Sequence, residues 1–341
     1  MNSCFIPPTP VRRGVVAFPA FLYGLLIAGA GFSTYIFGVL LGFLRIFLDP
    51  HGHWLGVIDR IVWYSGIPVV IGVFLILFDL LVLLPGKRIR KEILWNPLGN
   101  TNLTVVLTAF NDEASIGSAV EDFRSHPLVK RVIVVDNNSE DRTVEVAGDA
   151  GAIVVREPRQ GYGHCVWRAL KEGCRFSDTE LTLLCEGDMT FRSYDIDKLI
   201  AYLPHADIVS GTRISEQLRA LRTQLTTFMY YGNFFAGKLL ELKHLGRGTF
   251  TDVGTTYKLC RNAALERLFP LLNPAINLEF NAHFLDIALE TGLAIVECPI
   301  TFHNRVGVSK GGNISNWRAL QVGMRMITGI VVGWRKCQEG N

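Results

Sequence analysis

The segment LTVVLTAFNDEASIGSAV occupies residues 103–120 and joins an uncharged run to a polar turn and a helical pattern. The first eight residues are apolar or β-branched, which is typical of a strand covered on both faces. Short runs of the same kind follow, with amphipathic stretches between them, at 131–138, 152–157, 181–188 and 207–213. This alternation predicts a doubly wound α/β fold with a mostly parallel sheet.

Four of these runs end in polar motifs, which are AFNDE (109–113), VDNNSEDRT (135–143), CEGD (185–188) and GTR (211–213). Ligands of open α/β sheets bind beyond the carboxyl ends of the strands. Three of the four motifs contain carboxylates, which suit ribose or base hydrogen bonds, or a divalent cation that faces phosphate. Neither a GxGxxG nor a GxxxxGK[ST] pattern occurs, so the dinucleotide and P-loop signatures do not apply.

The hydrophobicity of the chain is concentrated near its N-terminus. The 341 residues are 49% hydrophobic and 19% charged, with a mean hydropathy of +0.27. Residues 15–47 and 61–85 are apolar runs that each exceed the roughly 20 residues needed to cross a bilayer. The polar segment 48–60 separates them. We therefore expect a transmembrane helical hairpin over 15–86; the alternative is a buried helical pair in a soluble protein.

Basic residues near the two runs predict the orientation of the hairpin. They precede the first run and follow the second, at Arg12, Arg13, Lys87, Arg88, Arg90 and Lys91. Both termini and the following domain are therefore expected on the cytoplasmic side. Asp79, inside the second run, is either a functional intramembrane charge or a partner of that basic end.

The expected organisation is a cytoplasmic N-terminus (1–14), the hairpin (15–86), a cytoplasmic α/β domain (87–312) and a C-terminal amphipathic helix (313–341). That last helix either lies in the membrane interface or packs on the domain core. A second helical segment, 225–243, is rich in Phe and Tyr. Hairpins of this kind often pack against copies of themselves, so self-association is an open expectation.

Charge and cysteine usage exclude other classes. A net charge of +3 is too small to predict a nucleic-acid partner. The seven cysteines form no CxxC pair, which argues against a disulfide framework or a zinc site and favours buried thiols. No cleavable signal peptide is evident, because the first apolar run is too long and leads into a second.

The strand-end motifs resemble those of family 2 glycosyltransferases with the GT-A fold. AFNDEASI and VDNNSEDRT resemble the first two motifs of that family, and EGD (186–188) stands where its DxD metal motif is expected. Three later segments resemble polyprenyl-phosphate glycosyltransferases: PRQGYGHCVWRAL (158–170), TDVGTTYKLCRNAAL (251–265) and VECPITFHNRVGVSK (296–310). The resemblance covers roughly 103–312 and keeps the order of the family.

This resemblance implies an inverting, metal-dependent enzyme. It would move a monosaccharide from a UDP- or GDP-sugar to a polyprenyl phosphate such as a dolichyl or undecaprenyl phosphate, at the cytoplasmic face of a membrane. A glycosyltransferase with another glycolipid or a glycan as acceptor is the first alternative. A non-enzymatic protein that binds sugar nucleotides is the second. The donor sugar and its base stay open.

The resemblance also implies site residues. Glu186 and Asp188 would bind Mg²⁺ or Mn²⁺, with Asp188 the safer ligand because the family usually has Asp at the first position. The nucleotide would contact Ala109, Phe110, Asp112, Asp136, Asn137, Gly161 and Gly163. The acceptor or diphosphate would contact Arg213, Thr255, Ser309 and Lys310. Asp188, Asp252 and Arg305 are the expected catalytic residues.

Several of these positions depart from the family pattern or could have a purely structural role. Asn137 replaces the second acid of the usual pair, and Lys258 replaces the usual Arg. Asp112 could instead be a helix N-cap. No general base is unmistakable, although Asp252 or Glu279 could serve. A phosphate monoester needs none, because its second pKa is about 6.

Overall fold

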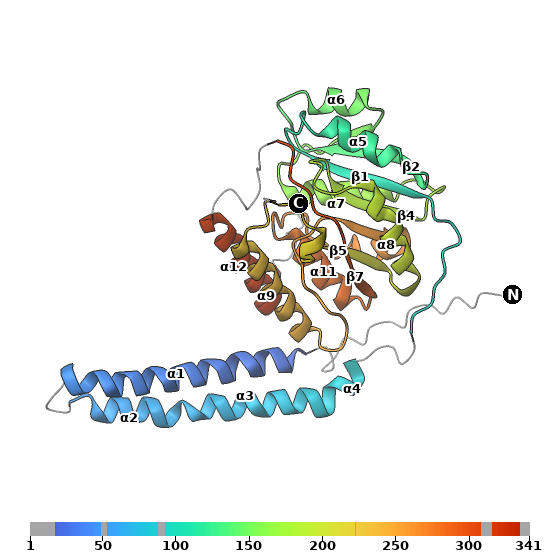
Figure 1. The fold of residues 1–341 in the computed structure, drawn as a ribbon. Coiled ribbons are helices and arrows are strands. Elements are labelled where there is room, and N and C mark those ends of the chain that lie inside the picture. Colours follow the sequence, from blue (N-terminus) through green and yellow to red (C-terminus); the bar gives the residue numbers. More distant parts are fainter. Residues whose placement is uncertain (1–17, 49–52, 88–92, 222, 308–315, 335–341) are drawn as a thin grey trace, which may run out of the picture. The chain divides into compact units, whose positions relative to one another are not determined.

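The computed structural model describes residues 18–48, 53–87, 93–221, 223–307 and 316–334 (Figure 1). Ser309, Lys310 and most of the basic residues that predicted the orientation of the hairpin lie outside these ranges. The described residues divide into two compact units. One contains the N-terminal helices, and the short segment 242–246 groups with it. The other contains the sheet, its helices and the C-terminal helix.

The N-terminal unit is a helical hairpin. Its elements are α1 (Ala20–Leu48), α2 (Leu55–Tyr64), α3 (Gly66–Phe78), a π-helical turn (Asp79–Leu83) and α4 (Leu84–Lys87). Two stretches, Ala20–Phe47 and Leu55–Lys87, are long and apolar enough to cross a membrane, with mean hydropathies of 1.8 and 3.0. Most of their side chains are exposed, unlike those of a helix in a soluble core.

Asp79 forms a buried ion pair at the end of this hairpin. Its two carboxylate oxygens lie 2.7 and 2.6 Å from Lys87 Nζ, and both residues are buried. The same carboxylate accepts a hydrogen bond of 2.6 Å from the backbone N–H of Phe21, in the first turn of α1. An anion there satisfies a helix-terminal amide that has no intrahelical acceptor. Of the two roles expected for Asp79, the structure shows the pairing.

The helices α1 and α3 approach each other at glycines. A Cβ atom added to Gly24 would lie 2.6 Å from the carbonyl oxygen of Gly72, and one added to Gly72 would lie 2.6 Å from the backbone nitrogen of Ala28. Backbone atoms cannot move aside as a flexible side chain can. This close approach therefore requires glycine at both positions.

We predict that Gly24→Val destabilises the hairpin by about 1–3 kcal/mol, the usual cost of overpacking. Gly29→Val is the matched control on the same helix, since a Cβ atom there meets nothing within 4 Å. The measurement is thermal unfolding of the full chain in detergent. Equal destabilisation by both substitutions would show that the Gly24–Gly72 contact does not hold the hairpin together.

The second unit is built on a seven-stranded sheet in the order β3-β2-β1-β4-β6-β5-β7. The strands are β1 (Leu103–Ala109), β2 (Val129–Asp136), β3 (Ile153–Arg156), β4 (Leu181–Glu186), β5 (Ile208–Thr212), β6 (Lys258–Arg261) and β7 (Ile295–Pro299). The first five confirm the expected strands to within about two residues. Strands β6 and β7 were not expected. The sheet is mixed, because β6 runs antiparallel to both β4 and β5 while the other pairs are parallel.

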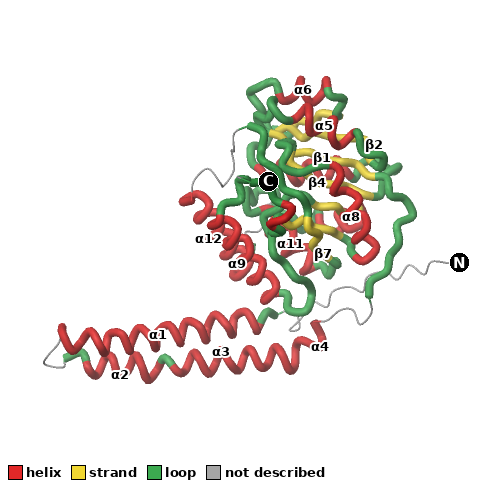
Figure 2. The backbone as a smooth tube through the Cα atoms, in the orientation of Figure 1, coloured by secondary structure: helices red, strands yellow, loops and turns green. Residues whose placement is uncertain are grey.

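Helices cover both faces of the sheet, which confirms the doubly wound arrangement (Figures 1 and 2). Side chains of α5 (Ile116–Arg124), α6 (Thr143–Asp149) and α8 (Ile196–Tyr202) share one buried core with the sheet. Helices α7 (Tyr162–Gly173), α10 (Asn262–Leu268) and α11 (Phe280–Glu290) contribute buried residues outside that core. In this unit, α9 (Thr227–Lys243) and α12 (Asn316–Val332) lie next to each other (Figures 1 and 2).

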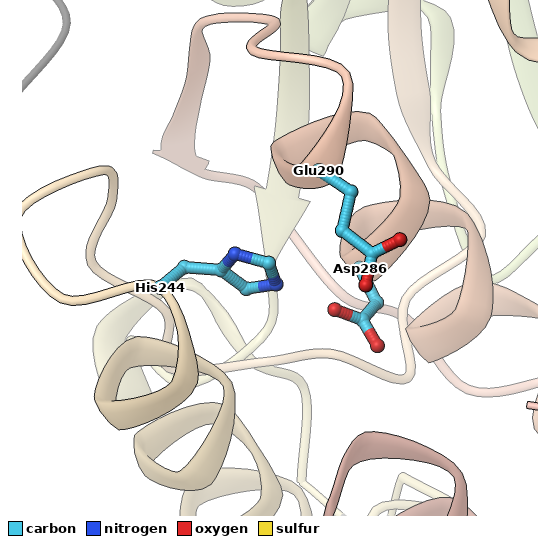
Figure 3. Close-up of side chains that lie close together, drawn as sticks. All are labelled: His244, Asp286 and Glu290. Atoms are coloured by element: carbon cyan, nitrogen blue, oxygen red, sulfur yellow. The ribbon is translucent and has the colours of Figure 1, made fainter. Parts of the chain in front are cut away.

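The C-terminal helix α12 is anchored on α11. Trp334 Nε1, just beyond α12, donates a hydrogen bond of 2.6 Å to Asp286 Oδ2, and its indole packs edge-on against the His283 ring. Figure 3 shows Asp286 and Glu290 on successive turns of α11; His244, also labelled there, lies in the segment that groups with the hairpin. Ile330 of α12 is also fully buried. The helix therefore packs on the domain, which is one of the two arrangements expected from the sequence.

Candidate functional site

The acidic motifs converge because their strands are neighbours. In the parallel ladders, Ala109 of β1 pairs with Asp136 of β2, and Thr108 of β1 pairs with Glu186 of β4. The carboxyl ends of β2, β1 and β4 therefore meet at one edge of the sheet, with β1 in the middle. Motifs that are far apart in the sequence become neighbours there.

Each of these strand ends turns through a residue in the left-handed region. Asn111, Asn138 and Met189 have φ values of 52°, 63° and 65°, and they are the described non-glycine residues with positive φ. Such conformations are sparsely populated and tend to occur at functional sites, where the surrounding structure holds them. Met189 directly follows Asp188, so the turn that places the metal-motif aspartate is conformationally strained.

Two carboxylates, Glu186 and Asp188, lie together at the end of β4. Asp188 is 2% exposed, and burial followed by the charge of Glu186 raises its pKa to about 7. Arg305 lies between Asp188 and Asp112, with guanidinium nitrogens 3.4 Å from Asp188 Oδ2 and 3.2 Å from Asp112 Oδ1. An arginine in this place indicates that the acidic edge requires a positive charge.

The same two acids have the donor chemistry of a divalent-cation site. Asp188 Oδ1 accepts hydrogen bonds from the backbone N–H and hydroxyl of Thr190, at 3.0 and 2.5 Å. Glu186 Oε1 accepts a hydrogen bond of 2.6 Å from the hydroxyl of Thr256. One oxygen of each carboxylate is thereby fixed. The second oxygen of Glu186 can coordinate a cation, and the second oxygen of Asp188, which lies 3.4 Å from Arg305, could do so in place of that ion pair. Carboxylate oxygens are the ligands preferred by Mg²⁺ and Mn²⁺, so the residues present fit such an ion.

Asp252, which is buried, and Arg213, whose side chain is 13% exposed, form a bidentate pair. Arg213 Nε and Nη2 each lie 2.7 Å from an oxygen of Asp252, and the backbone N–H of Arg213 donates to the same carboxylate at 3.1 Å. Burial alone would raise the pKa of Asp252, but Arg213 outweighs it and holds that pKa below its ordinary value. Asp252 is therefore a firmly ionised partner of Arg213, and its hydrogen bonds do not favour a role as general base.

A cavity of about 530 Å³ opens over this edge of the sheet. Its polar wall includes Asp112, Glu186, Asp188, Arg213 and Arg305. Its apolar wall comes from the helices α9 and α12, with Phe228, Met229, Phe235, Leu320, Met324, Met326 and Ile327. The two walls belong to the same compact unit. A ligand that filled the cavity would therefore meet charges at one part of its surface and aliphatic and aromatic side chains at another.

The structure separates the residues expected at the site into two groups. Those on the cavity wall are Ala109, Phe110, Asp112, Asn137, Gly161, Glu186, Asp188, Arg213 and Arg305. Those away from the wall are Asp136, Gly163, Asp252 and Thr255, all buried. Gly163 has a packing reason to be glycine, since a Cβ atom there would lie 1.7 Å from the carbonyl oxygen of Ile276.

Asp136 and Asn137 hold the local backbone together. Asp136 is fully buried and accepts hydrogen bonds from the backbone N–H of Ser139, at 3.2 and 3.3 Å. The amide of Asn137 donates to the carbonyl oxygens of Glu157 and Arg159 and accepts from the N–H of Gly161 at 2.8 Å. The Asn137 side chain thus joins the end of β2 to the start of α7.

Other residues of the cavity were not anticipated from the sequence. Tyr162 begins α7, Asn281 lies in the first turn of α11, and Arg318 lies in the first turn of α12; all three line the cavity. Tyr162 lies in the segment 158–170, whose resemblance to the family pointed to the site. That resemblance was used to assign the flanking Gly161 and Gly163, and not Tyr162. Asn281 and Arg318 lie in no recognised motif.

Comparison with known proteins agrees with this geometry. Residues 104–269 match the family model described as glycosyl transferase family 2. The chain is 32% identical over 114 residues to protein RfbJ of Shigella flexneri, covering 33% of this chain and 85% of that protein. It is 26% identical to a dolichyl-phosphate hexose transferase of Haloferax volcanii, covering 61% of this chain and 86% of the relative.

Solved structures show the same fold. Glucosyl-3-phosphoglycerate synthase from Mycobacterium tuberculosis, in complex with Mn²⁺, UDP-glucose and phosphoglyceric acid, superposes with a TM-score of 0.50. The alignment covers 70% of this chain and 82% of that one at 18% identity. At this level of identity the similarity establishes the GT-A fold alone.

We predict that Asp252→Asn lowers the free energy of unfolding by about 3–5 kcal/mol, because it leaves the buried charge of Arg213 without its partner. Asp178→Asn is the control, since Asp178 pairs with Arg131 at an exposed position and its loss should cost less than about 1 kcal/mol. Denaturant unfolding measures both values. A loss at Asp252 no larger than that at Asp178 would contradict the structural role.

Proposed function

Because the chain belongs to glycosyl transferase family 2, we propose that it transfers a monosaccharide from a UDP- or GDP-sugar to a polyprenyl phosphate, with Mg²⁺ or Mn²⁺ as its metal. The relative named as a dolichyl-phosphate hexose transferase supports the lipid acceptor, and the Mn²⁺ and UDP-glucose complex of the structural neighbour supports the metal and the donor. The family assignment itself makes the chain a glycosyltransferase.

One observation carries the choice of acceptor. A single cavity joins the acidic edge of the sheet to the apolar wall of α9 and α12. A nucleoside diphosphate needs the charged part of this cavity but not the apolar part. A polyprenyl phosphate would bring its headgroup to the first part and its isoprene chain to the second, and burial of that chain is favourable by about 0.8 kcal/mol per CH₂ group.

The carboxylates on the cavity wall favour a phosphate acceptor. Among the described lining residues they are Asp112, Glu186 and Asp188. Asp112 is paired with Arg305, and the other two are the proposed metal ligands. Glu279, which the sequence left open as a base, is buried, pairs with Arg325 and does not line the cavity. An alcohol acceptor would need a base to remove its proton, whereas a phosphate monoester is largely ionised near neutral pH.

The proposed reaction is one inverting displacement. An oxygen of the acceptor phosphate forms a bond to the anomeric carbon while the bond from that carbon to the nucleoside diphosphate breaks, so no proton has to be moved. A metal ion held by Glu186 and Asp188 would neutralise the charge of the leaving diphosphate. Arg305 would help to hold phosphate oxygens, because guanidinium groups suit such contacts.

The membrane location is part of the same proposal. Exposed apolar side chains occur on α9, where Phe228, Tyr231 and Phe235 are 45–64% exposed, and on α12, where Trp317 and Met324 are 68% and 55% exposed. Large exposed apolar surfaces mark interaction sites, and a membrane surface suits an enzyme with a lipid acceptor. The hairpin would tether the enzyme with both termini in the cytoplasm.

The test is transfer of radiolabelled sugar from a panel of UDP- and GDP-sugars to undecaprenyl or dolichyl phosphate in vesicles, with Mn²⁺ or Mg²⁺. We expect a charged lipid product that is lost with EDTA, and Asp188→Asn should lower the rate at least about 100-fold, as the loss of a charge-stabilising group does elsewhere. Transfer only to diacylglycerol or to an oligosaccharide would overturn the polyprenyl-phosphate acceptor, and unchanged transfer by Asp188→Asn would overturn the metal assignment.

Arg318 gives a second prediction, because it places a cation on the cavity wall at the start of the apolar residues of α12. Arg318→Gln should raise the KM for the lipid phosphate about tenfold, which is the worth of one charge-assisted hydrogen bond. Arg325→Gln is the matched control on the same helix, since Arg325 pairs with Glu279 and does not line the cavity. Equal effects of the two substitutions on KM would remove Arg318 from the acceptor site.

A further inference from the structure

A lysine side chain is buried on β6, the strand next to β4, which ends at Glu186. Lys258, the first residue of β6, is 1% exposed. Its Nζ donates hydrogen bonds to the carbonyl oxygen of Thr255 and, at 3.2 Å, to Asn281 Oδ1. Among the described residues no carboxylate forms an ion pair with it. Burial lowers the pKa of Lys258 to about 8, so near neutral pH this site holds a charge that is costly to bury.

A chain of hydrogen bonds leads from this lysine to Glu186. Asn281 Nδ2 donates to the hydroxyl oxygen of Tyr162 at 2.9 Å. The hydroxyls of Tyr162 and Thr256 lie 2.5 Å apart, and Thr256 Oγ1 lies 2.6 Å from Glu186 Oε1. Each link is within ordinary hydrogen-bond distance. The chain therefore connects the ammonium group of Lys258 to the first carboxylate of the metal motif through three neutral side chains.

The direction of every hydrogen bond follows from the chemistry of the groups. Thr256 Oγ1 donates its single proton to Glu186 Oε1. Thr256 then accepts from Tyr162, and Tyr162 in turn accepts from Asn281. Burial, followed by the charge of Glu186, raises the pKa of Tyr162, so its hydroxyl keeps the proton that it donates. All donors point from Lys258 toward Glu186, an arrangement in which the bonds polarise one another.

Four separate parts of the domain build this chain. Tyr162 comes from the first turn of α7, Thr256 from the segment before β6, Asn281 from the first turn of α11, and Glu186 from the end of β4. Tyr162 is itself held by a hydrogen bond of 2.8 Å from its backbone N–H to Asn277 Oδ1. Because several elements fix the groups that lead to Glu186, the Glu186 side chain has little conformational freedom.

We propose that Lys258, Asn281, Tyr162 and Thr256 are positioning residues that hold the Glu186 side chain in the rotamer that presents its second oxygen to a divalent cation shared with Asp188. The inference rests on the metal-dependent function proposed above. Groups that orient metal ligands in this way typically contribute 10- to 100-fold to metal affinity.

The experiment measures Mn²⁺ binding directly, by electron paramagnetic resonance titration of the full chain in detergent with UDP present. Thr256→Val removes the hydroxyl that donates to Glu186 and keeps the shape of the side chain, so we expect Mn²⁺ to bind about 10- to 100-fold more weakly. Thr256→Ser restores the hydroxyl and should bind Mn²⁺ within about threefold of the unsubstituted chain.

Lys258→Met separates positioning from folding. It replaces a buried charge by an apolar side chain of similar length, so the midpoint of thermal unfolding at pH 7 should not fall, whereas Mn²⁺ binding should weaken. The unsubstituted chain should also gain stability as the pH rises through about 8 toward the ordinary lysine range. In that range the unfolded chain binds the proton and the folded chain does not. The Met variant should lack this gain.

Unchanged Mn²⁺ affinity in Thr256→Val would overturn the inference. So would a result in which Thr256→Val and Lys258→Met both bind Mn²⁺ more weakly only because both are less stable. Absence of Mn²⁺ binding by the unsubstituted chain would overturn it as well. These outcomes are distinct from failure of the proposed function, because no lipid acceptor or sugar transfer enters the measurement. A chain that binds Mn²⁺ but transfers no sugar to a polyprenyl phosphate would contradict the proposed function. The Mn²⁺ affinities of the Thr256 and Lys258 variants would then still decide this inference.

Discussion

The site depends on a concentration of negative charge at the carboxyl edge of three parallel strands. Glu186 and Asp188 are close enough for Glu186 to help to raise the pKa of Asp188, and Asp112 adds a third carboxylate to the same cavity wall. Like charges in a buried place require a compensating cation. Arg305 supplies one, and a divalent ion would supply a stronger one.

The positive charges around this edge are held by different means. Arg213 is fixed by its bidentate pair with Asp252, whereas Arg305 is shared between Asp112 and Asp188. Lys258 is buried without a carboxylate partner among the described residues and is connected to Glu186 only through neutral side chains. A fixed pair such as Arg213 and Asp252 organises the wall, and a shared cation such as Arg305 is better suited to turn toward a phosphate.

Much of the fold could be predicted from the sequence because its central strands are continuous apolar runs. Strands β6 and β7 were missed because β6 begins with Lys258 and β7 contains Glu297, so neither resembles a continuous apolar run. The place of Glu186 and Asp188 on the cavity wall was predictable, because their motif lies at the end of a predicted strand. Such placement was not predictable for Tyr162, Thr256 and Asn281, because their roles arise from tertiary contacts between distant segments. Asp136 and Gly163 lie in recognisable motifs. In the fold, however, Asp136 accepts hydrogen bonds from the local backbone, and Gly163 allows close packing.

The central claim is that one cavity receives both a charged headgroup and an isoprene chain. Photocrosslinking with a polyprenyl phosphate that carries a diazirine in its first isoprene units, followed by peptide mapping, tests it most directly. The account predicts that α9 around residues 228–235 and α12 around residues 320–327 are labelled when Mn²⁺ and UDP are present. Unlabelled polyprenyl phosphate should compete with this labelling. Labelling confined to the N-terminal hairpin, or labelling that polyprenyl phosphate does not compete away, would contradict it.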